Sequence, residues 1–343
     1  MLDNTFSKMD PVYETMGLLY VSYNLEEVKK ETKKTLSDLG FDGEQFYSQH
    51  LKTFDKYVRV FLKNRVEHSE SGFFFSEKDS NYFLILLSLM IENRCWLTSL
   101  EGLSEVQIKS QIIHMCKTVF DEDTNAESLD SLDEVIHYLD SSGLQSDAKW
   151  KMLRVMQNPK KYMSQLIEII NSNMDAYQRA VNEVINPLDK LLNQYGIMAT
   201  SQGDKNFYEL KATICQSSVV YPTLIFPVTQ MMFEKNCYYG LLSERIIKSG
   251  KVRQNSKELL LVKLKALADS SKLGILSALK VSPMYNLEIA QQLGVTAATM
   301  SHHMNVLLNC GLVGVEKKDG KVYYHLEKDN LQNFIKDLEE TLL

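Results

Sequence analysis

The pattern of hydrophobic and polar positions changes twice along the chain and predicts three stretches of different structure. Over residues 1–200, apolar side chains recur at helical spacing between capping residues, which is typical of amphipathic helices. Residues 206–241 are rich in β-branched and aromatic side chains, with turn signals at Tyr221-Pro222 and Lys235-Asn236, and predict a small antiparallel β element. Residues 256–343 return to short helices, followed by two alternating strands and a last helix. The expected fold class is therefore mainly α (α+β).

Capping residues and helix breakers place the expected N-terminal helices. The Asp10-Pro11 pair begins the first helix, and Asn24 begins a second that ends at Gly40. A helical pattern over 160–194 contains Pro187, which predicts a kink or break there. The other predicted helix starts are Asp42, for a helix to about Val66, and Ser76, Ser104 and Ser146.

Apolar and aromatic runs in the N-terminal stretch are expected to build its core. Tyr47, Phe54, Tyr57 and Phe61 recur at helical spacing and so share one face of a helix. The neighbouring aromatic run 73–75 lines either a pocket or the core. The apolar run 82–91 is flanked by charge and is too short to span a bilayer, so we expect a buried helix.

The order of elements over residues 256–343 is that of a winged helix-turn-helix. The segment "NLEIAQQLGVT" is a short helix ended by Gly294, and "AATMSHHMNVLLNC" is a longer one that Thr296 caps and Gly311 stops. Two alternating strands then meet at Asp319-Gly320, a dipeptide that supplies the positive φ angles of a tight hairpin. The other predicted helices are 256–269, apolar on nearly all sides, "SSKLGILSALK", capped by Ser270 or Ser271, and Asp329 to Leu342.

Helical periodicity divides the side chains of the predicted recognition helix into two faces. Met300, Met304, Leu307 and Leu308 follow helical spacing and are expected to face the core, with His303 beside them. On the other face, Ser, Thr, Asn and His side chains reach base edges or phosphates of a major groove, and lysines of the hairpin suit phosphates or the minor groove. The candidate DNA-binding residues are Lys272, Thr296, Ala298, Thr299, Ser301, His302, His303, Asn305, Lys317, Lys318 and Lys321.

Several motifs in the last quarter of the chain, in the correct order, resemble the ArsR/SmtB family of bacterial transcriptional regulators. The matching stretches are "LKALADSSKLGILSAL" and "LEIAQQLGVTAATMSHHMNVLLNCGLVGVEKKDGKVYYHL", and the departures are Met304 for a usual Leu, Asn305 for a common Lys and His325 for a common Arg. The resemblance implies a homodimer that binds an inverted-repeat operator in double-stranded DNA, often as a repressor released by a ligand. It also implies a dimer interface built from the first and last helices of this domain. The candidate dimerisation residues there are Leu260, Leu264, Leu331, Phe334, Ile335 and Leu338.

The metal-binding residues of the family are missing from this sequence. The third-helix region reads "MYNLEIAQQ" without a cysteine, and the last helix has no histidine, so neither familiar metal site is expected. Because neighbouring helical residues point about 100° apart, His302 and His303 are not expected to share a metal ion. The five cysteines are far apart and show no CxxC pairing, which is typical of free thiols in a reducing compartment. We expect no cofactor, no signal peptide, and a cytoplasmic location without membrane contact.

Charge agrees only mildly with DNA binding. The net charge of the chain is −6, which argues against bulk affinity for nucleic acid. Residues 256–328 contain nine lysines against six acidic residues, so the segment before the last helix is locally basic.

The length of the chain predicts a second domain of different function. We expect residues 1–250 to form a helical effector-binding and dimerisation domain, and residues 256–343 to bind DNA. The chain contains no GxGxxG, P-loop, HExxH or GxSxG motif, so an enzyme is not expected. Two alternatives stay open: a winged helix used only for dimerisation in a partner-binding protein or enzyme, and a redox sensor that acts through Cys310.

Overall fold

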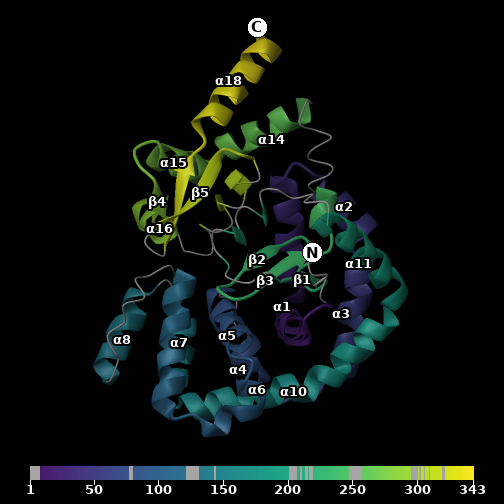
Figure 1. Ribbon diagram of the computed structural model, residues 1–343, viewed down its shortest axis with the longest axis vertical. Coiled ribbons are helices and arrows are strands. Elements are labelled where there is room, and N and C mark those ends of the chain that lie inside the picture. Colours follow the sequence, from purple (N-terminus) through teal and green to yellow (C-terminus); the bar gives the residue numbers. More distant parts are fainter. Residues whose placement is uncertain are drawn as a thin grey trace. The chain divides into compact units, whose positions relative to one another are not determined.

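The structure is mainly helical and contains two small sheets in its described part (Figure 1). It is a computed structural model that describes residues 8–76, 80–120, 131–142, 144–200, 207–208, 211–212, 215, 219–246, 257–294, 300, 303–304, 306–308, 310–318 and 321–343. The chain divides into two compact units. The first comprises Met1–Val28, Lys52–Ser201 and Cys215–Leu241, and the second comprises Lys29–Leu51, Gln202–Ile214 and Leu242–Leu343.

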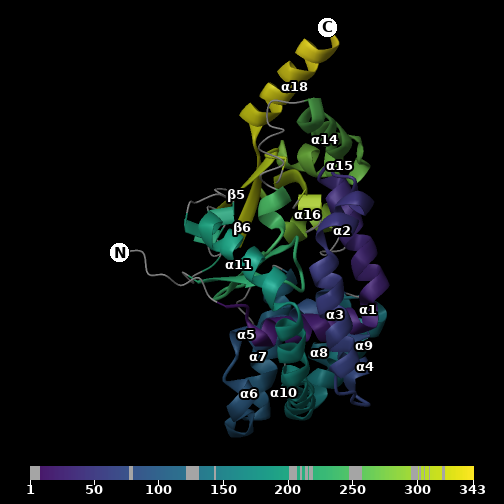
Figure 2. The same cartoon turned by 90° about the vertical axis from the view of Figure 1, so that its right-hand side faces the viewer.

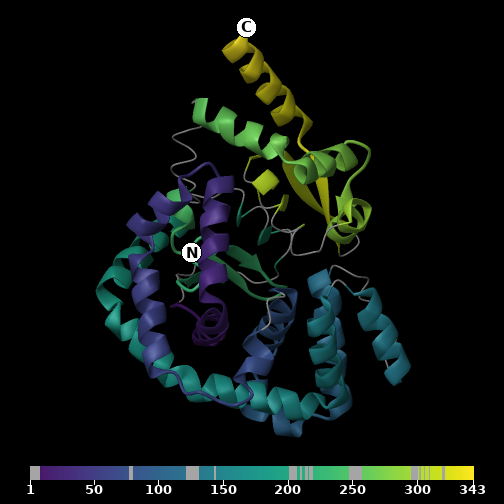
Figure 3. The same cartoon turned by 180° about the vertical axis from the view of Figure 1, so that it is seen from behind.

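A long helix, α10 (Pro159–Glu183), is the element against which most helices of the first unit pack. It begins at Pro159, whose fixed φ suits the first position of a helix. Figure 3 shows its curved path past α3 and on towards α7. The other helices of this unit are α3 (Lys52–Asn64), α4 (Ser71–Phe75), α5 (Ser80–Glu92), α6 (Trp96–Ser99), η1 (Leu100–Gly102), α7 (Glu105–Phe120), α8 (Leu132–Ser141), α9 (Ser146–Gln157) and α11 (Ile185–Thr200).

Helix α1 (Pro11–Asp38) contributes its first part to the first unit and its remainder to the second. Its backbone leaves helical geometry at Asn24, with φ −124° and ψ 25°. The Asn24 side-chain amide donates to the carbonyl oxygens of Tyr20, at 3.1 Å, and Phe75, at 2.8 Å. Asn24 therefore interrupts the helix where the sequence predicts a new one to begin.

The sheet of the first unit is mixed, which corrects the expectation of a purely antiparallel element. Its strands are β1 (Val220–Thr223), β2 (Gln230–Met232) and β3 (Cys237–Gly240), in the order β1-β3-β2. β2 and β3 form an antiparallel hairpin across the predicted turn at Lys235-Asn236, whereas β1 pairs with β3 in parallel. Pro222, expected in a turn, lies within β1, and an edge strand tolerates a residue that cannot donate.

The start of α1 packs closely against the sheet and the loop that follows β1. The ring of Tyr13 stacks on that of Tyr238 with their centroids 3.7 Å apart, and a Cβ on Gly17 would approach the Ile225 side chain to 2.7 Å. Two buried carboxylates, Asp10 and Glu14, lie one helical turn apart on this segment. Asp10 accepts from Tyr238 Oη and from the Arg94 guanidinium, both at 2.5 Å.

Glu14 is fully buried and accepts four hydrogen bonds from two distant segments. Its Oε1 accepts from Thr223 Oγ1 at 2.6 Å and from the backbone N–H of Leu224 at 3.0 Å. Its Oε2 accepts from Tyr57 Oη at 2.9 Å and from the backbone N–H of Ile225 at 3.1 Å. The carboxylate thus ties α1 to α3 and to the loop after β1.

Several expected core positions and helix starts are confirmed. Phe54, Tyr57 and Phe61 are buried on α3, and Ser104 caps α7 through its hydroxyl, 3.3 Å from the Gln107 N–H. α5 is buried on nearly all sides. Among the described residues no single helix is long and apolar enough to cross a membrane, although α5 together with Trp96–Gly102, across a 75° bend, passes that test by length and composition.

Other helix boundaries differ from the prediction. The helix expected over 42–66 is two helices, α2 (Gly43–His50) and α3, separated at Leu51. Ser76 is the C-cap of α4, with its backbone N–H and its hydroxyl both donating to the Gly72 carbonyl, and α5 begins at Ser80. Gln145, not Ser146, is the residue before α9, and α10 ends at Glu183, before Pro187 is reached.

The second unit contains the elements of the winged helix-turn-helix. Its β4-β6-β5 sheet is antiparallel throughout, and α14 packs against α18, which leads away from the end of β6 (Figure 2). Besides α2, the elements are α14 (Lys257–Ala268), α15 (Ser270–Leu279), β4 (Met284–Tyr285), α16 (Asn286–Leu293), β5 (Val313–Lys318), β6 (Lys321–Leu326) and α18 (Lys328–Leu342). The sequence predicts each of these except β4.

Candidate nucleic-acid interface

The turn between the two helices of the motif is set by a left-handed residue. α16 ends at Gly294, whose φ is +66° and ψ 32°, and its N–H returns to the Ala290 and Gln291 carbonyls. Glycine adopts this conformation without the steric cost that a Cβ imposes. Gly294 therefore ends α16 where the sequence predicts.

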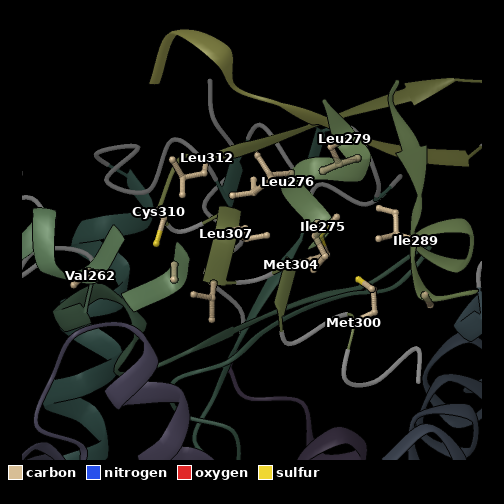
Figure 4. Close-up of a cluster of buried hydrophobic side chains, with 14 residues drawn as sticks. Val262, Ile275, Leu276, Leu279, Ile289, Met300, Met304, Leu307, Cys310 and Leu312 are labelled. Carbon is tan, nitrogen blue, oxygen red and sulfur yellow. The ribbon is translucent and has the colours of Figure 1, made fainter. Parts of the chain in front are cut away.

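The described residues of the recognition segment are helical at positions 300, 303–304 and 306–308. Met300, Met304 and Leu307 are each at most 1% exposed and belong to one apolar cluster with α15 and α16. Figure 4 shows these three side chains converging with Ile275 and Ile289. Three of the four residues predicted for the buried face are therefore confirmed; Leu308 is half-buried, and Val306, which was not predicted, is buried as well.

His303 lies at the edge of this buried face, beside the start of α15. Asp269 caps α15 by accepting from the Lys272 N–H at 2.9 Å, so Asp269 takes the role predicted for Ser270 or Ser271. Partial burial raises the pKa of the Asp269 carboxyl, but the hydrogen bond from Lys272 and the nearby Lys272 and His303 side chains outweigh burial and lower that pKa. Asp269 thus links the start of α15 electrostatically to the recognition segment.

The predicted contact of Lys272 with a DNA phosphate requires an exposed ammonium, but the structure buries this side chain. Its side chain is 6% exposed, and its Nζ lies 3.6 Å from Asp269 Oδ2. An ammonium that is buried next to a carboxylate pairs with it inside the domain and is not accessible to a DNA phosphate. We therefore assign Lys272 a structural role and leave it out of the proposed DNA surface.

The wing is an antiparallel hairpin, and Lys318 is the last residue of its first strand, β5. β5 and β6 pair in antiparallel register from Val313 opposite Leu326 to Lys318 opposite Lys321. Lys318 is exposed, so its ammonium is accessible to a phosphate. At the base of the hairpin, a Cβ on Gly314 would collide with the side chains of His325 and Glu327, which hydrogen-bond each other at 3.0 Å.

Most predicted base-contacting residues lie outside the described residues. These are Thr296, Ala298, Thr299, Ser301, His302 and Asn305, and the same holds for the side chains of Lys317 and Lys321. The structure brings together the elements that carry them: the turn at Gly294, the helical residues around Met304 and the hairpin that ends at Lys318.

Cys310 lies in the turn after the recognition segment and is buried, with 6% of its surface exposed. Burial raises the pKa of its thiol to about 11, although Lys263 and Lys272 act in the opposite direction. At neutral pH only about one thiol in ten thousand would be the reactive thiolate. This environment disfavours the alternative in which Cys310 senses oxidants.

The described residues contain no group of three or more His, Cys, Asp or Glu side chains that could hold a metal ion. Of the expected dimerisation residues, Ile335 is exposed, while Leu260, Leu264, Leu331 and Leu338 are half-buried. Phe334 is 2% exposed, with the Lys263 ammonium 5.9 Å above its ring, so it joins α14 to α18 within one chain.

Comparison with known proteins identifies the C-terminal motif. The profile of the family described as "Bacterial regulatory protein, arsR family" matches residues 269–315, from the cap of α15 into β5. The HTH-type transcriptional regulators CmtR of Mycobacterium bovis and of Mycobacterium tuberculosis are each 33% identical to the chain over 79 residues, which is 23% of this chain and 67% of the relative. The chain belongs to the ArsR family. This ArsR-family protein is therefore a DNA-binding transcriptional regulator, and its family is one of regulators rather than enzymes.

The family profile matches residues 269–315, and the alignments to the CmtR regulators span 23% of this chain. No solved structure matches the chain significantly.

Sequence reasoning overlooked Asp269, and the signal was present: an aspartate directly before the "SSK" that begins a helix is a typical N-cap.

Proposed function

We propose that the ArsR-family protein is a homodimeric repressor that binds an inverted-repeat operator through two recognition segments and two wings. The observation that carries this proposal is the burial of one apolar face of the recognition segment in the core. Met300, Met304 and Leu307 are buried in the core, and helical periodicity then predicts that the polar positions between them face a major groove. We take Ser301 and His302 as the base-contacting residues.

The dimer interface is proposed to lie on α14 and α18. These helices carry apolar side chains that a single chain leaves exposed: Leu261 is 55% exposed, Ile335 48% and Leu342 72%. A second copy would remove these surfaces from water, and a two-fold axis would place the recognition segments on successive turns of DNA. Half-sites about 10 base pairs apart follow from this arrangement.

We propose that the effector acts through the N-terminal region and not through a metal ion bound at the family's familiar sites. The support is the size of the region preceding the winged helix and the lack, in the sequence, of the cysteine and histidine ligands of those sites. We also expect a cytoplasmic location, which follows from a DNA partner.

The test is binding of the full chain to a labelled fragment from upstream of its own gene, with competitor DNA and a salt series. We expect specific binding that weakens with salt, and we expect Lys318→Ala to weaken binding to all sequences and flatten the salt slope by about one unit. Ser301→Ala should instead change sequence preference. Lys328→Ala removes another exposed lysine, at the start of α18, and serves as the matched control.

Three outcomes count against the proposal. A folded dimer without specific binding would favour a winged helix retained only for assembly. A change in specificity alone from Lys318→Ala would remove the wing from the phosphate contacts. Equal losses from Lys318→Ala and Lys328→Ala would mean that the two lysines contribute only general charge.

A further inference from the structure

A short basic segment interrupts the acidic N-terminal part of the chain. Residues 149–161, "KWKMLRVMQNPKK", contain five lysines and arginines and no acidic residue, although the whole chain has a net charge of −6. The segment covers most of α9 and the first turn of α10. Such a concentration of one charge raises the local potential and attracts anions.

Two of these cations lie over a pair of stacked aromatic rings. Phe73 of α4 and Tyr162 of α10 are stacked, with ring centroids 4.9 Å apart and an interplanar angle of 24°. The Arg154 guanidinium carbon lies 5.3 Å from the Phe73 centroid and 5.7 Å from that of Tyr162. Lys151 Nζ lies 6.0 Å from the Phe73 centroid and 5.7 Å from that of Tyr82. We call Phe73, Tyr162, Lys151 and Arg154 the cation–aromatic cluster.

Within the described part of the chain, Arg154 forms no ion pair with a carboxylate, although its side chain is exposed. Lys161 is likewise exposed and lies 5.8 Å from the Tyr162 centroid. Elsewhere in the basic segment, Lys160 pairs with Glu101 at 3.6 Å. The edge of the Arg154 guanidinium is therefore accessible to an anion.

Contact with the aromatic rings also restricts the Arg154 guanidinium before a ligand binds. A guanidinium held over a ring face loses little further freedom when it binds, and the N–H groups at its edge match two oxygens of one phosphoryl group. Lysine supplies a point charge beside such a pair. The arrangement suits a compact oxyanion better than a neutral ligand, and a phosphoryl group better than a lone carboxylate, because several cations surround it.

We propose that the cation–aromatic cluster, together with Lys161, is a binding site for a phosphoryl group. The group belongs either to a phosphorylated small molecule or to the DNA backbone beyond the operator core. The small-molecule source rests on the proposed function, since it would be the effector of the regulator, whereas phosphoryl binding itself does not depend on it.

The first experiment titrates the full chain with inorganic pyrophosphate. Trp150, 62% exposed and adjacent to Lys151, provides a fluorescence reporter, while the other tryptophan, Trp96, is 3% exposed. We expect saturable binding that weakens at least about tenfold in Arg154→Gln, with Arg154→Lys intermediate because it keeps the charge and loses the bidentate edge. Arg179→Gln removes an exposed arginine elsewhere on α10 and should leave binding unchanged.

A second arm measures binding of the same variants to a duplex without an operator across a salt series. If the phosphoryl group comes from DNA, Arg154→Gln lowers the salt slope by about one unit; if it comes from a small molecule, the slope stays constant and only pyrophosphate binding is lost. The proposal is overturned if Arg154→Gln matches the wild type with both probes, or if Arg179→Gln causes the same loss. A wild type that binds pyrophosphate but no operator would refute the proposed function alone.

Discussion

The buried Glu14 predicts that the first unit becomes less stable as pH rises through neutrality. Burial raises the pKa of its carboxyl from 4.5 to about 7, against the opposing effect of hydrogen bonds from Thr223, Tyr57, Leu224 and Ile225. In the unfolded chain the same carboxyl ionises near its ordinary value. A group whose pKa is higher in the folded state contributes most stability below the unfolded pKa, and that contribution is lost as pH rises through the folded pKa.

The size of the effect follows from the two pKa values. A shift from 4.5 to about 7 corresponds to a loss of about 3 kcal/mol once both states are ionised, and about 2 kcal/mol of it falls between pH 5.5 and pH 8. In Glu14→Gln the amide cannot ionise, so this contribution disappears. The variant carries its own pH-independent cost, about 1–3 kcal/mol, because its Nε2 group faces the Ile225 N–H and leaves that donor unpaired.

The pH dependence of the free energy of unfolding can be measured by urea unfolding between pH 5.5 and pH 8. Tryptophan fluorescence reports on the first unit, because Trp96 and Trp150 both lie there. We expect the wild type to lose about 2 kcal/mol relative to Glu14→Gln as pH rises. Glu26→Gln, at an exposed position of the same helix, should follow the wild type. The reasoning is refuted if the difference in unfolding free energy between the wild type and Glu14→Gln stays constant with pH, or if the wild type becomes more stable relative to the variant as pH rises. Either result would show that the four hydrogen-bond donors keep the carboxylate ionised and outweigh the effect of burial.

Two further substitutions test the winged helix-turn-helix. Gly294→Ala places a Cβ on a residue with φ +66°, so we expect about 1 kcal/mol lower stability of the winged helix in thermal unfolding and weaker operator binding; unchanged binding would mean that the turn does not position the recognition segment. Ile335→Lys introduces a charge into the proposed dimer interface, so sedimentation should show an at least tenfold weaker dimer, whereas Asn333→Lys on the other side of α18 should not; equal behaviour of the two variants would place the interface elsewhere.

All elements of the winged helix except β4 were predictable because each carries a local signal. Gly294 and Gly311 both adopt positive φ, and Met300, Met304 and Leu307 repeat with the helical period, so sequence alone gives the turn and the buried face. The same local reasoning failed for Lys272. Whether a lysine at a helix start faces solvent depends on what packs around it, and here the domain closes over its ammonium beside Asp269.

The N-terminal region was less predictable because its decisive contacts join distant parts of the sequence. The parallel pairing of β1 with β3 has no local sequence signal, since it depends on where β2 lies. Glu14 reads as an ordinary polar residue in the first turn of a helix, yet it meets donors more than 200 residues away at Thr223 and Leu224. Periodicity identifies which helices exist, but not which polar side chains are taken into the interior.

Methionine supplies two of the side chains that hold the recognition segment in place, Met300 and Met304. An unbranched thioether chain rotates about more bonds than leucine and can refill its space after a small displacement. The shape of DNA varies with its sequence, so one protein meets grooves of different width at different operators. If the proposed operator binding holds, we expect these methionines to let the segment tilt slightly between such sites at low energetic cost, so that the protein tolerates a broader set of operators with less discrimination among them.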